Sequence, residues 1–452
     1  MSVTAGDPRR QALVRLRDGF SRFFRAEAAG ALILLVAALA ALLIANSPLN
    51  EAARSLWNMD AGFSVGRLAF HQSLLHWVDD GLMALFFFVV GLEVKRELLV
   101  GELSTTRKAL LPILAALGGM VAPAVIFFAM NAGGAGARGW GVPVATDIAF
   151  ALGVMALLGS RVPSGLKVFL AALAIADDIG AIIVIALFYT SHVSPVWLLV
   201  AAVLLALLVA LNRLGVDTPW AYFFVGGLLW FAVLLSGVHP TIAGVLVALS
   251  IPATAKLEPL AFIRHARGSL DDIEATHVRG AHVLVDDSQQ RAALDIRRAA
   301  RRTAAPLQRL EFTLHPFTTF VVLPLFALGN AGVRLSGGSV SALVGSPVVL
   351  GVVTGLVVGK PLGIAVMSWL AVRLGLAELP RGVRWGHILG AGMLGGIGFT
   401  MSIFVANLAF TDPAIASAAK AAVLSASVVS GVAGYLVLAR YCRVTRGTDA
   451  SS

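Results

Sequence analysis

The chain is poor in charged residues, which make up 13% of its 452 positions, whereas an ordinary soluble protein carries about 25%. Hydrophobic residues make up 58% of the chain, and its mean hydropathy is +0.86. So few polar groups could not cover the surface of a water-soluble globule of this size. The apolar excess also excludes an intrinsically disordered chain. We therefore expect lipid to be the solvent for most of the chain.

Cysteine and nucleotide-binding motifs are also scarce. Cys442 is the only cysteine, and one thiol forms neither an internal disulfide nor a thiolate metal cluster. The glycine-lysine segment at 355–361 misses the phosphate-loop pattern, because Thr354 stands where Gly is required and Pro361 where Ser or Thr is required. The sequence therefore predicts neither a cofactor nor a nucleotide as energy source.

Long apolar runs are abundant. Runs of about 16 to 24 residues, enough to cross roughly 30 Å of hydrocarbon as helices, recur between short polar breaks. The sequence therefore predicts an all-α polytopic membrane protein with about twelve transmembrane helices. The predicted spans are 28–46, 74–92, 109–130, 141–159, 167–190, 196–211, 218–236, 239–255, 314–331, 347–370, 387–410 and 415–439.

The positive charges predict the orientation of these spans. The net charge is +10, and 29 of the 35 lysines and arginines fall on the side of the two termini, with four on the opposite side and two inside spans. Cytoplasmic loops of membrane proteins carry the excess of Lys and Arg. Both termini are therefore predicted to be cytoplasmic, in a bacterial inner membrane, and the basic balance requires no nucleic acid partner.

The spans divide the chain into five predicted segments. The longest polar one holds 18 of the 60 charged residues and contains helix-forming stretches such as 288–309. We interpret it as a solvated cytoplasmic insertion, with a site for acidic lipid or a partner as the alternative. The segments are a cytoplasmic N-terminal segment at 1–27, spans 1 to 8 at 28–255, the charged insertion at 256–311, spans 9 to 12 at 312–439 and a cytoplasmic tail at 440–452.

Five charged residues lie inside predicted spans and away from their ends: Asp147, Asp177, Asp178, Lys360 and Lys420. Asp79 and Asp80 lie at the outer end of span 2, where water can reach them. An uncompensated charge in lipid costs about 3 kcal/mol or more, so such residues are candidates for a functional site. Asp177 and Asp178 are adjacent, about 100° apart on a helix, and should have different partners. Burial and mutual repulsion favour protonation of one carboxylate, which suits exchange of protons for a cation. The alternative is a buried salt-bridge cluster with Lys360, and Lys420 has no assigned role.

Helix-breaking residues surround one of these charges. Pro143 precedes Thr146 and Asp147 in span 4, and proline frees backbone carbonyl groups that are tolerated at membrane depth only along protein or a wet cavity. Carboxylate, hydroxyl and carbonyl oxygens together form a ligand set for a hard cation such as Na⁺ or Li⁺.

A second break occurs late in the chain. Span 11 contains a glycine-rich break at 394–402, with Gly395, Gly396 and Gly398. Spans 4 and 11 each lie next to a proline-interrupted span, and the neighbouring spans 3 and 10 run in opposite directions. This pattern is typical of inverted-topology repeats whose two broken helices cross near the midplane.

These residues belong to segments that resemble the NhaA family of Na⁺/H⁺ antiporters over nearly the whole chain. The resemblance implies a secondary active antiporter, not an enzyme, that extrudes Na⁺ or Li⁺ in exchange for external H⁺ by alternating access. The matching segments, in family order, are LFFFVVGLEVKREL (85–98), ATDIAFALGVMALLGSRVP (145–163), LAIADDIGAIIVIALFYT (173–190), SGVHPTIAGV (236–245), LHPF (314–317), LPLFALGNAGV (323–333), GKPLGI (359–364) and GIGFTMSIF (396–404).

The resemblance also implies roles for individual residues. Asp178 matches the principal carboxylate for cation and proton, and Asp177 the neighbour that pairs with Lys360. Thr146 matches a cation ligand, while Asp147 and Lys360 would compensate the positive and negative ends of the half-helices. Exchange would be electrogenic if two protons leave per cation, and whether Asp177 or Lys360 carries the second proton stays open.

Regulation and assembly follow from the same resemblance. A cytoplasmic cluster is associated with pH response, and residues 47–73 are long enough for the small hairpin with which relatives form homodimers. His239 matches another position linked to pH, with a structural role as the alternative. The members of the cluster are Glu93, Lys95, Arg96, Glu97, Glu311 and His315.

Three other functions are alternatives to antiport. An intramembrane aspartyl protease would want a GxGD-type sequence, which ADDIG at 176–180 lacks. A passive channel usually builds its filter from rings of subunits, whereas opposed broken helices and a lysine favour a carrier. A sodium-coupled solute symporter is the nearest rival because it shares inverted repeats. Adjacent aspartates facing Lys360 favour direct proton exchange.

Overall fold

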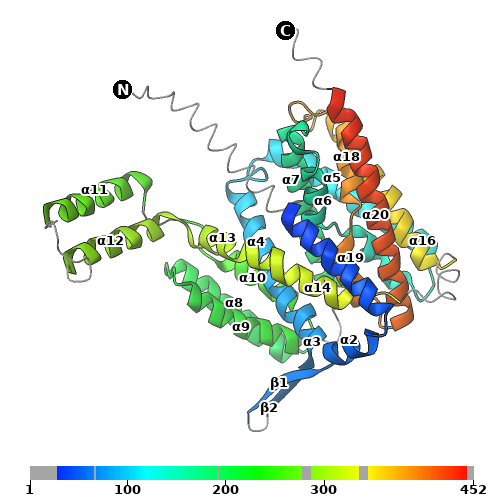
Figure 1. Ribbon diagram of the computed structural model, residues 1–452, viewed down its shortest axis with the longest axis horizontal. Coiled ribbons are helices and arrows are strands. Elements are labelled where there is room, and N and C mark those ends of the chain that lie inside the picture. The colour runs from blue at the N-terminus through cyan, green and yellow to red at the C-terminus, as the bar shows by residue number, and fades with distance from the viewer. Residues whose placement is uncertain are drawn as a thin grey trace.

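The computed structural model describes residues 28–65, 68–190, 193–255, 257–276, 287–334 and 345–444. The predicted N-terminal segment at 1–27 and the end of the predicted tail lie outside these residues. The described chain is mostly helical, and its longer helices run side by side in one bundle (Figure 1).

The first half of the chain begins with the helix Ala28–Ala45. A short surface helix and a β-hairpin separate it from the remaining helices. The elements that follow are α2 (Asn50–Trp57), β1 (Asp60–Val65), β2 (Leu68–Ser73), α3 (Leu74–His76), η1 (Trp77–Leu82), α4 (Met83–Leu99), α5 (Thr106–Asn131), η2 (Ala137–Val144), α6 (Ile148–Ala156), η3 (Gly159–Arg161), α7 (Ser164–Phe188), α8 (Pro195–Arg213), α9 (Pro219–Ser236) and α10 (Thr241–Ser250).

The second half continues with a pair of polar helices and returns to the bundle. Three short π-helical turns, η1, η4 and η5, interrupt its α-helices and those of the first half. The elements are α11 (Pro259–Thr276), α12 (Asp287–Thr303), α13 (Pro306–Phe317), η4 (Thr318–Val322), α14 (Leu323–Asn330), α16 (Pro347–Thr354), η5 (Gly355–Gly359), α17 (Lys360–Arg373), α18 (Trp385–Gly395), α19 (Phe399–Ala409) and α20 (Pro413–Val444).

Nine helices in the described ranges are long and apolar enough to cross a membrane, or ten if α18 and α19, which are bent by 46°, count as one span. The chain is therefore a polytopic helical membrane protein. The predicted count of twelve is met only in part by this criterion. The predicted span 239–255 forms the ten-residue α10, which ends at Ser250 because Pro252 follows. The predicted span 74–92 is helical through α3, η1 and α4, and it carries Asp79 and Asp80 in η1.

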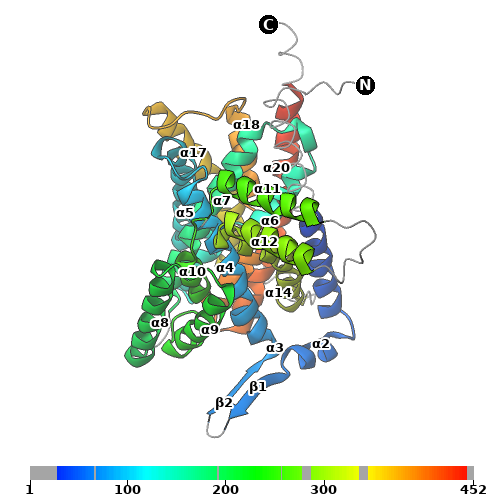
Figure 2. The same cartoon turned by 90° about the vertical axis from the view of Figure 1, so that its left-hand side faces the viewer.

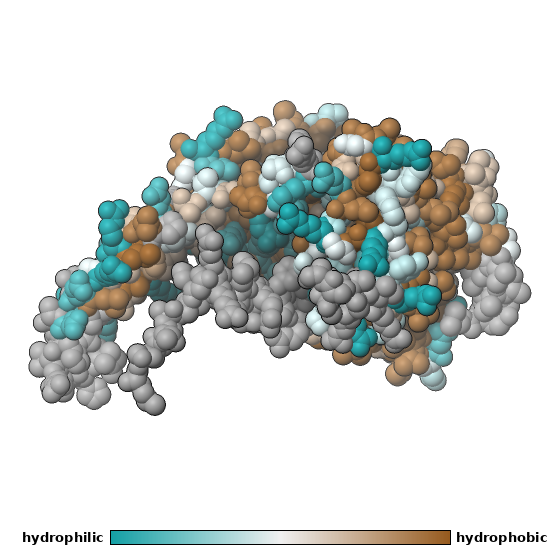
Figure 3. All heavy atoms as spheres, turned by 90° about the horizontal axis from the view of Figure 1, so that it is seen from above, coloured by the Kyte–Doolittle hydropathy of each residue, from teal (hydrophilic) through white to brown (hydrophobic). Residues whose placement is uncertain are grey.

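Apolar side chains form much of the outer wall of the bundle. Polar ones gather toward its middle and along the helix pair α11 and α12, which we call the arm (Figure 3). On α8, Leu199 is 66% exposed, and on α20, Val428 is 65% exposed. Such a surface fits hydrocarbon and not water. The arm lies outside the bundle (Figures 1 and 2), and its base is closed where Leu257 N–H donates to the carbonyl of Arg302 at 3.1 Å.

The hairpin expected between residues 47 and 73 is present. β1 pairs with β2 in antiparallel register, with Asp60 opposite Ser73. It extends away from the bundle at the end opposite the C-terminal end of α20 (Figure 2).

Close backbone contact between α5 and α17 places Lys360 in the interior. A Cβ built on Gly118 would lie 2.2 Å from the carbonyl oxygen of Gly363, so only glycine permits this approach. Small residues at such positions are the usual means by which membrane helices pack closely. The start of α17 is thereby held against α5, and Lys360 is fully buried.

Candidate functional site

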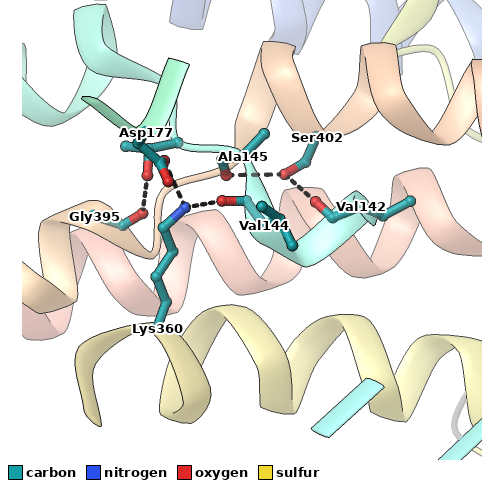
Figure 4. A network of polar contacts seen from close by, with 8 residues as sticks. Val142, Val144, Ala145, Asp177, Lys360, Gly395 and Ser402 are labelled. Atoms are coloured by element: carbon teal, nitrogen blue, oxygen red, sulfur yellow. Dashed lines mark hydrogen bonds and ion pairs between the residues drawn. The ribbon is translucent and has the colours of Figure 1, made fainter. Parts of the chain in front are cut away.

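Two breaks in the helices meet inside the bundle. The first separates η2 from α6 at residues 145–147, and the second separates α18 from α19 at residues 396–398. The backbone N–H of Asp147 donates to the carbonyl of Ile397 at 2.7 Å. Ser402 on α19 donates from Oγ to the carbonyl of Val142 at 2.7 Å. The two breaks are thus held directly against each other (Figure 4). We call the place where they meet the crossing.

Local sequence explains both breaks. Pro143 has no backbone N–H to continue the helical pattern, and the chain becomes extended at Ala145, with φ −77° and ψ 145°. In the second break, a Cβ on Gly396 would lie 2.4 Å from the carbonyl oxygen of Leu356. A side chain there would therefore push the break away from η5.

Asp147 serves the N-termini of two half-helices. Its Oδ1 accepts from the backbone N–H of Phe150 at 3.0 Å and caps α6. Its Oδ2 accepts from the backbone N–H of Thr400 at 3.1 Å and from the Thr400 hydroxyl at 2.5 Å, at the start of α19. One buried carboxylate therefore faces two positive helix ends, which stabilise a negative charge.

The C-terminal ends of the other two half-helices also have donors. Lys360 Nζ donates to the carbonyl of Val144, the last residue of η2. Thr146 donates from Oγ1 to the carbonyl of Gly395, the last residue of α18, at 2.8 Å. A cation at a C-terminal end compensates its partial negative charge. The four ends at the crossing are thus each met by a complementary group.

Lys360 and Asp177 form a buried ion pair. The distance from Nζ to Oδ2 is 2.8 Å, and the two side chains are 0% and 1% exposed. Among the described residues, the second oxygen of Asp177 has no hydrogen-bond partner, and neither does Oδ1 of the adjacent Asp178. A buried carboxylate oxygen without a donor is costly unless it binds a proton or a cation. The pair of aspartates is therefore chemically suited to take up either one.

A cavity of about 350 Å³ leads to Asp178. It is lined by Thr146, Asp147 and Asp178, and also by Glu93 and Glu311. The charges that act on Asp178 include those of Asp177, Glu93 and Asp147, all negative, and that of Lys360. The cavity thus leads a small cation into a region of excess negative charge.

The residues expected in the pH cluster lie together, with one exception. Arg96 contacts Glu97 at 3.1 Å and Glu311 at 3.3 Å, while His315 Nε2 lies 3.6 Å from Glu93. Lys95 instead donates to the carbonyls of Leu249 and Ile251, at 2.6 and 2.5 Å, beside the end of α10.

His239 lies apart from this group. Its Nδ1 is 3.1 Å from Thr241 Oγ1 and its Nε2 is 3.9 Å from Asp80. Asp80 belongs to η1, at the opposite end of α4 from Glu93. The structure therefore does not bring His239 into the cluster of Glu93 and Glu311.

Two hydroxyl groups of the site are not among the residues predicted from the sequence. Thr400 and Ser402 are 1% and 0% exposed and bind the opposite break. The available signal was their place beside the glycine break in GIGFTMS at 396–402. Lys420 lies on α20 and interacts electrostatically with Asp79 of η1, away from the crossing.

Comparisons with known proteins agree over nearly the whole chain. Residues 21–438 match the family model described as Na⁺/H⁺ antiporter 1. The chain is 48% identical to the Na⁺/H⁺ antiporter NhaA of Oleidesulfovibrio alaskensis, covering 95% of each chain. It is 49% identical to Na⁺/H⁺ antiporter NhaA 1 of Saccharophagus degradans, covering 93% of this chain and 90% of that protein. It is 48% identical to the NhaA of Acidithiobacillus ferrooxidans, covering 94% and 98%.

Proposed function

The chain belongs to the NhaA family of Na⁺/H⁺ antiporters and exchanges these two ions across a membrane, and from this premise we propose that Asp178 and Asp177 bind them. The protein is a transporter and not an enzyme, needs no cofactor, and has the transported ions as its ligands. The observation that carries the proposal is the unpartnered oxygen on each aspartate, of which Asp178 lines the cavity.

Competition for Asp178 couples the two ions. Na⁺ or Li⁺ arriving through the cavity displaces the proton, because a small hard cation satisfies the same carboxylate oxygen. Thr146 supplies a further oxygen ligand, and the freed carbonyls of the two breaks are within the same region. Asp147 and Lys360 keep the opposed helix ends neutral when the charge at Asp178 changes.

Asp177 and Lys360 provide the second charge change. Their ion pair is buried, so cation binding next to it shifts the proton balance of the whole group. Loss of two protons for each monovalent cation makes the exchange electrogenic, and a membrane potential contributes roughly 2.3 kcal/mol per charge per 100 mV. The cluster of Arg96, Glu311 and His315 at the cavity adjusts this exchange to pH.

Alternating access moves the site between the two sides of the membrane. In this scheme the chain has twelve spans, which include two inverted repeats of three spans each, and the crossing of α6 with α19 is the pivot. Both termini are cytoplasmic in the bacterial inner membrane. The cavity is lined by Glu102 and Lys167, which lie in segments predicted on the side of the termini, and it therefore opens to the cytoplasm. The hairpin β1–β2 pairs with that of a second copy in a homodimer, since a two-stranded sheet is marginal alone.

Asp178→Asn tests the proposal in everted membrane vesicles. Sodium-driven proton movement, followed with a pH-sensitive dye, is expected to disappear because a neutral amide does not titrate and so cannot exchange a proton for a cation. Asp295→Asn, on the exposed arm, serves as the control and should retain exchange. Normal exchange by Asp178→Asn would rule out the assigned site. Sodium, lithium and potassium, each tested without an organic solute, also separate an antiporter from a solute symporter.

A further inference from the structure

A hydrogen-bonded chain of side chains joins three helices away from the cavity. Asn330, at the end of α14, donates to Asp79 Oδ1 on η1 at 2.7 Å and accepts from Asn407 Nδ2 on α19 at 2.7 Å. Asn330 is 2% exposed. We name Asp79, Asn330 and Asn407 the polar bridge. It links α19, which carries Thr400 of the ion site, to η1 and α14, neither of which contains a residue of the two breaks.

An apolar layer accompanies the polar bridge. The ring of Phe404 on α19 lies 5.7 Å from that of Phe87 on α4 and 6.1 Å from that of Phe326 on α14, between centroids. All three side chains are buried. We name them the aromatic layer. Rings packed in this way fill space without leaving a path for water or a hydrated ion.

The same order of layers recurs along each helix. On α19, Thr400 lines the cavity, Phe404 follows one turn later, and Asn407 one turn after that. Along α14, Leu323 lines the cavity, Phe326 belongs to the aromatic layer, and Asn330 belongs to the polar bridge.

The third helix has this order in reverse chain direction. On α4, Val90 lines the cavity and Phe87 belongs to the aromatic layer, while Asp79 precedes both in η1. Three helices thus place both layers on the side of the site away from the cavity. None of the six residues lines the cavity.

The polar bridge differs from ordinary packing in its energetics. Aromatic contacts can slide, but an Asn330 amide that loses Asp79 and Asn407 keeps only the carbonyl of Phe326 on its own helix, at 3.2 Å, and its oxygen must find water. The bridge therefore holds α19 against η1 and α14 until water enters from the far side.

We propose that the aromatic layer and the polar bridge form the closure of the ion pathway on the side away from the cavity, with Asn330 as the positioning residue that keeps it shut. The proposal rests on alternating access as the mode of transport. It predicts that Asn330 must release Asp79 and Asn407 before the site can open to the far side.

Side-specific labelling of a cysteine at the ion site tests this closure. The parent for the experiment is Cys442→Ser combined with Asp178→Cys, which places the only thiol next to the cavity. A membrane-impermeant thiol reagent is applied to right-side-out and to everted vesicles. Labelling is expected from the cavity face only. Adding Asn330→Ala should raise the rate from the far face about thirtyfold, because the closed state loses both hydrogen bonds of the polar bridge.

Two further variants complete the design. Asn407→Ala removes only one bond of the bridge and should also raise far-face labelling, which covers the case in which Asn330→Ala fails to fold. Asn212→Ala removes a comparable bond, from Nδ2 to the carbonyl of Ser250 at 2.7 Å, and should leave labelling unchanged. Unchanged far-face labelling in both bridge variants would overturn the proposal, as would fast far-face labelling in the parent. Because the readout requires no exchange activity, it is independent of the ion-binding role proposed for Asp178.

Discussion

At the scale of single residues, charge compensation dominates the site. Asp147 accepts three hydrogen bonds from two helix starts, and Lys360 joins one helix end to Asp177. Breaking a buried ion pair leaves one charge without its partner, and this typically costs about 3–5 kcal/mol, whereas replacing both partners can be neutral. Stability and transport should therefore respond differently to changes in this pair.

Lys360→Met is expected to lower the free energy of unfolding by about 3–5 kcal/mol, because Asp177 stays buried without its cation. The double variant Asp177→Asn with Lys360→Met should recover most of this loss but should not recover electrogenic exchange. Thermal unfolding of the purified protein in detergent and potential-driven exchange in proteoliposomes measure the two effects. A double variant as unstable as the single one would contradict the compensating role of the pair.

Sequence analysis found the charged residues of the site but not its neutral ones. Asp147, Asp177, Asp178 and Lys360 stand out because an ionisable group is rare in an apolar run. Thr400 and Asn330 give no such signal, since hydroxyl and amide groups are common in membrane helices and their partners lie far away in sequence. Thr400 contacts Asp147 across 253 positions.

At the scale of helices, glycines set how closely the broken segments approach. A Cβ on Gly396 would lie 2.4 Å from the backbone oxygen of Leu356, whereas a Cβ on Gly227 of α9 would meet nothing within 4 Å. Backbone cannot move aside as a flexible side chain can. The chain pattern predicted a break here, but the π-helical turn η5 that presses against it has no recognisable signal in the sequence.

Gly396→Ala should therefore destabilise the protein by about 1–3 kcal/mol, the range for overpacking, and reduce exchange with it. Gly227→Ala is the matched control, and we expect it to be neutral or slightly stabilising because alanine favours helix. Midpoints of thermal unfolding for the two variants provide the comparison. Equal midpoints would show that the break at Gly396 can shift without cost.

At the scale of the whole molecule, the ion site and the arm of α11 and α12 are separate. The polar groups around the cavity come from the bundle, and the cluster proposed to respond to pH is built on α4 and α13. The arm leaves and rejoins the bundle at nearly one point, where Leu257 bonds to Arg302. A loop of this kind can be shortened at little entropic cost.

Replacing residues 258–301 by a short glycine-serine linker should therefore leave both the exchange rate and its pH profile as in the parent. The physical reason is that the cluster of Glu93, Arg96, Glu311 and His315 is built without any described side chain of α11 or α12, so its ion pairs remain in place. Exchange in everted vesicles over a range of pH measures both quantities, with Arg96→Ala as the control that should alter the profile. A shifted profile in the shortened protein would assign the arm to regulation, through acidic lipid or a partner, and would end its interpretation as a solvated insertion.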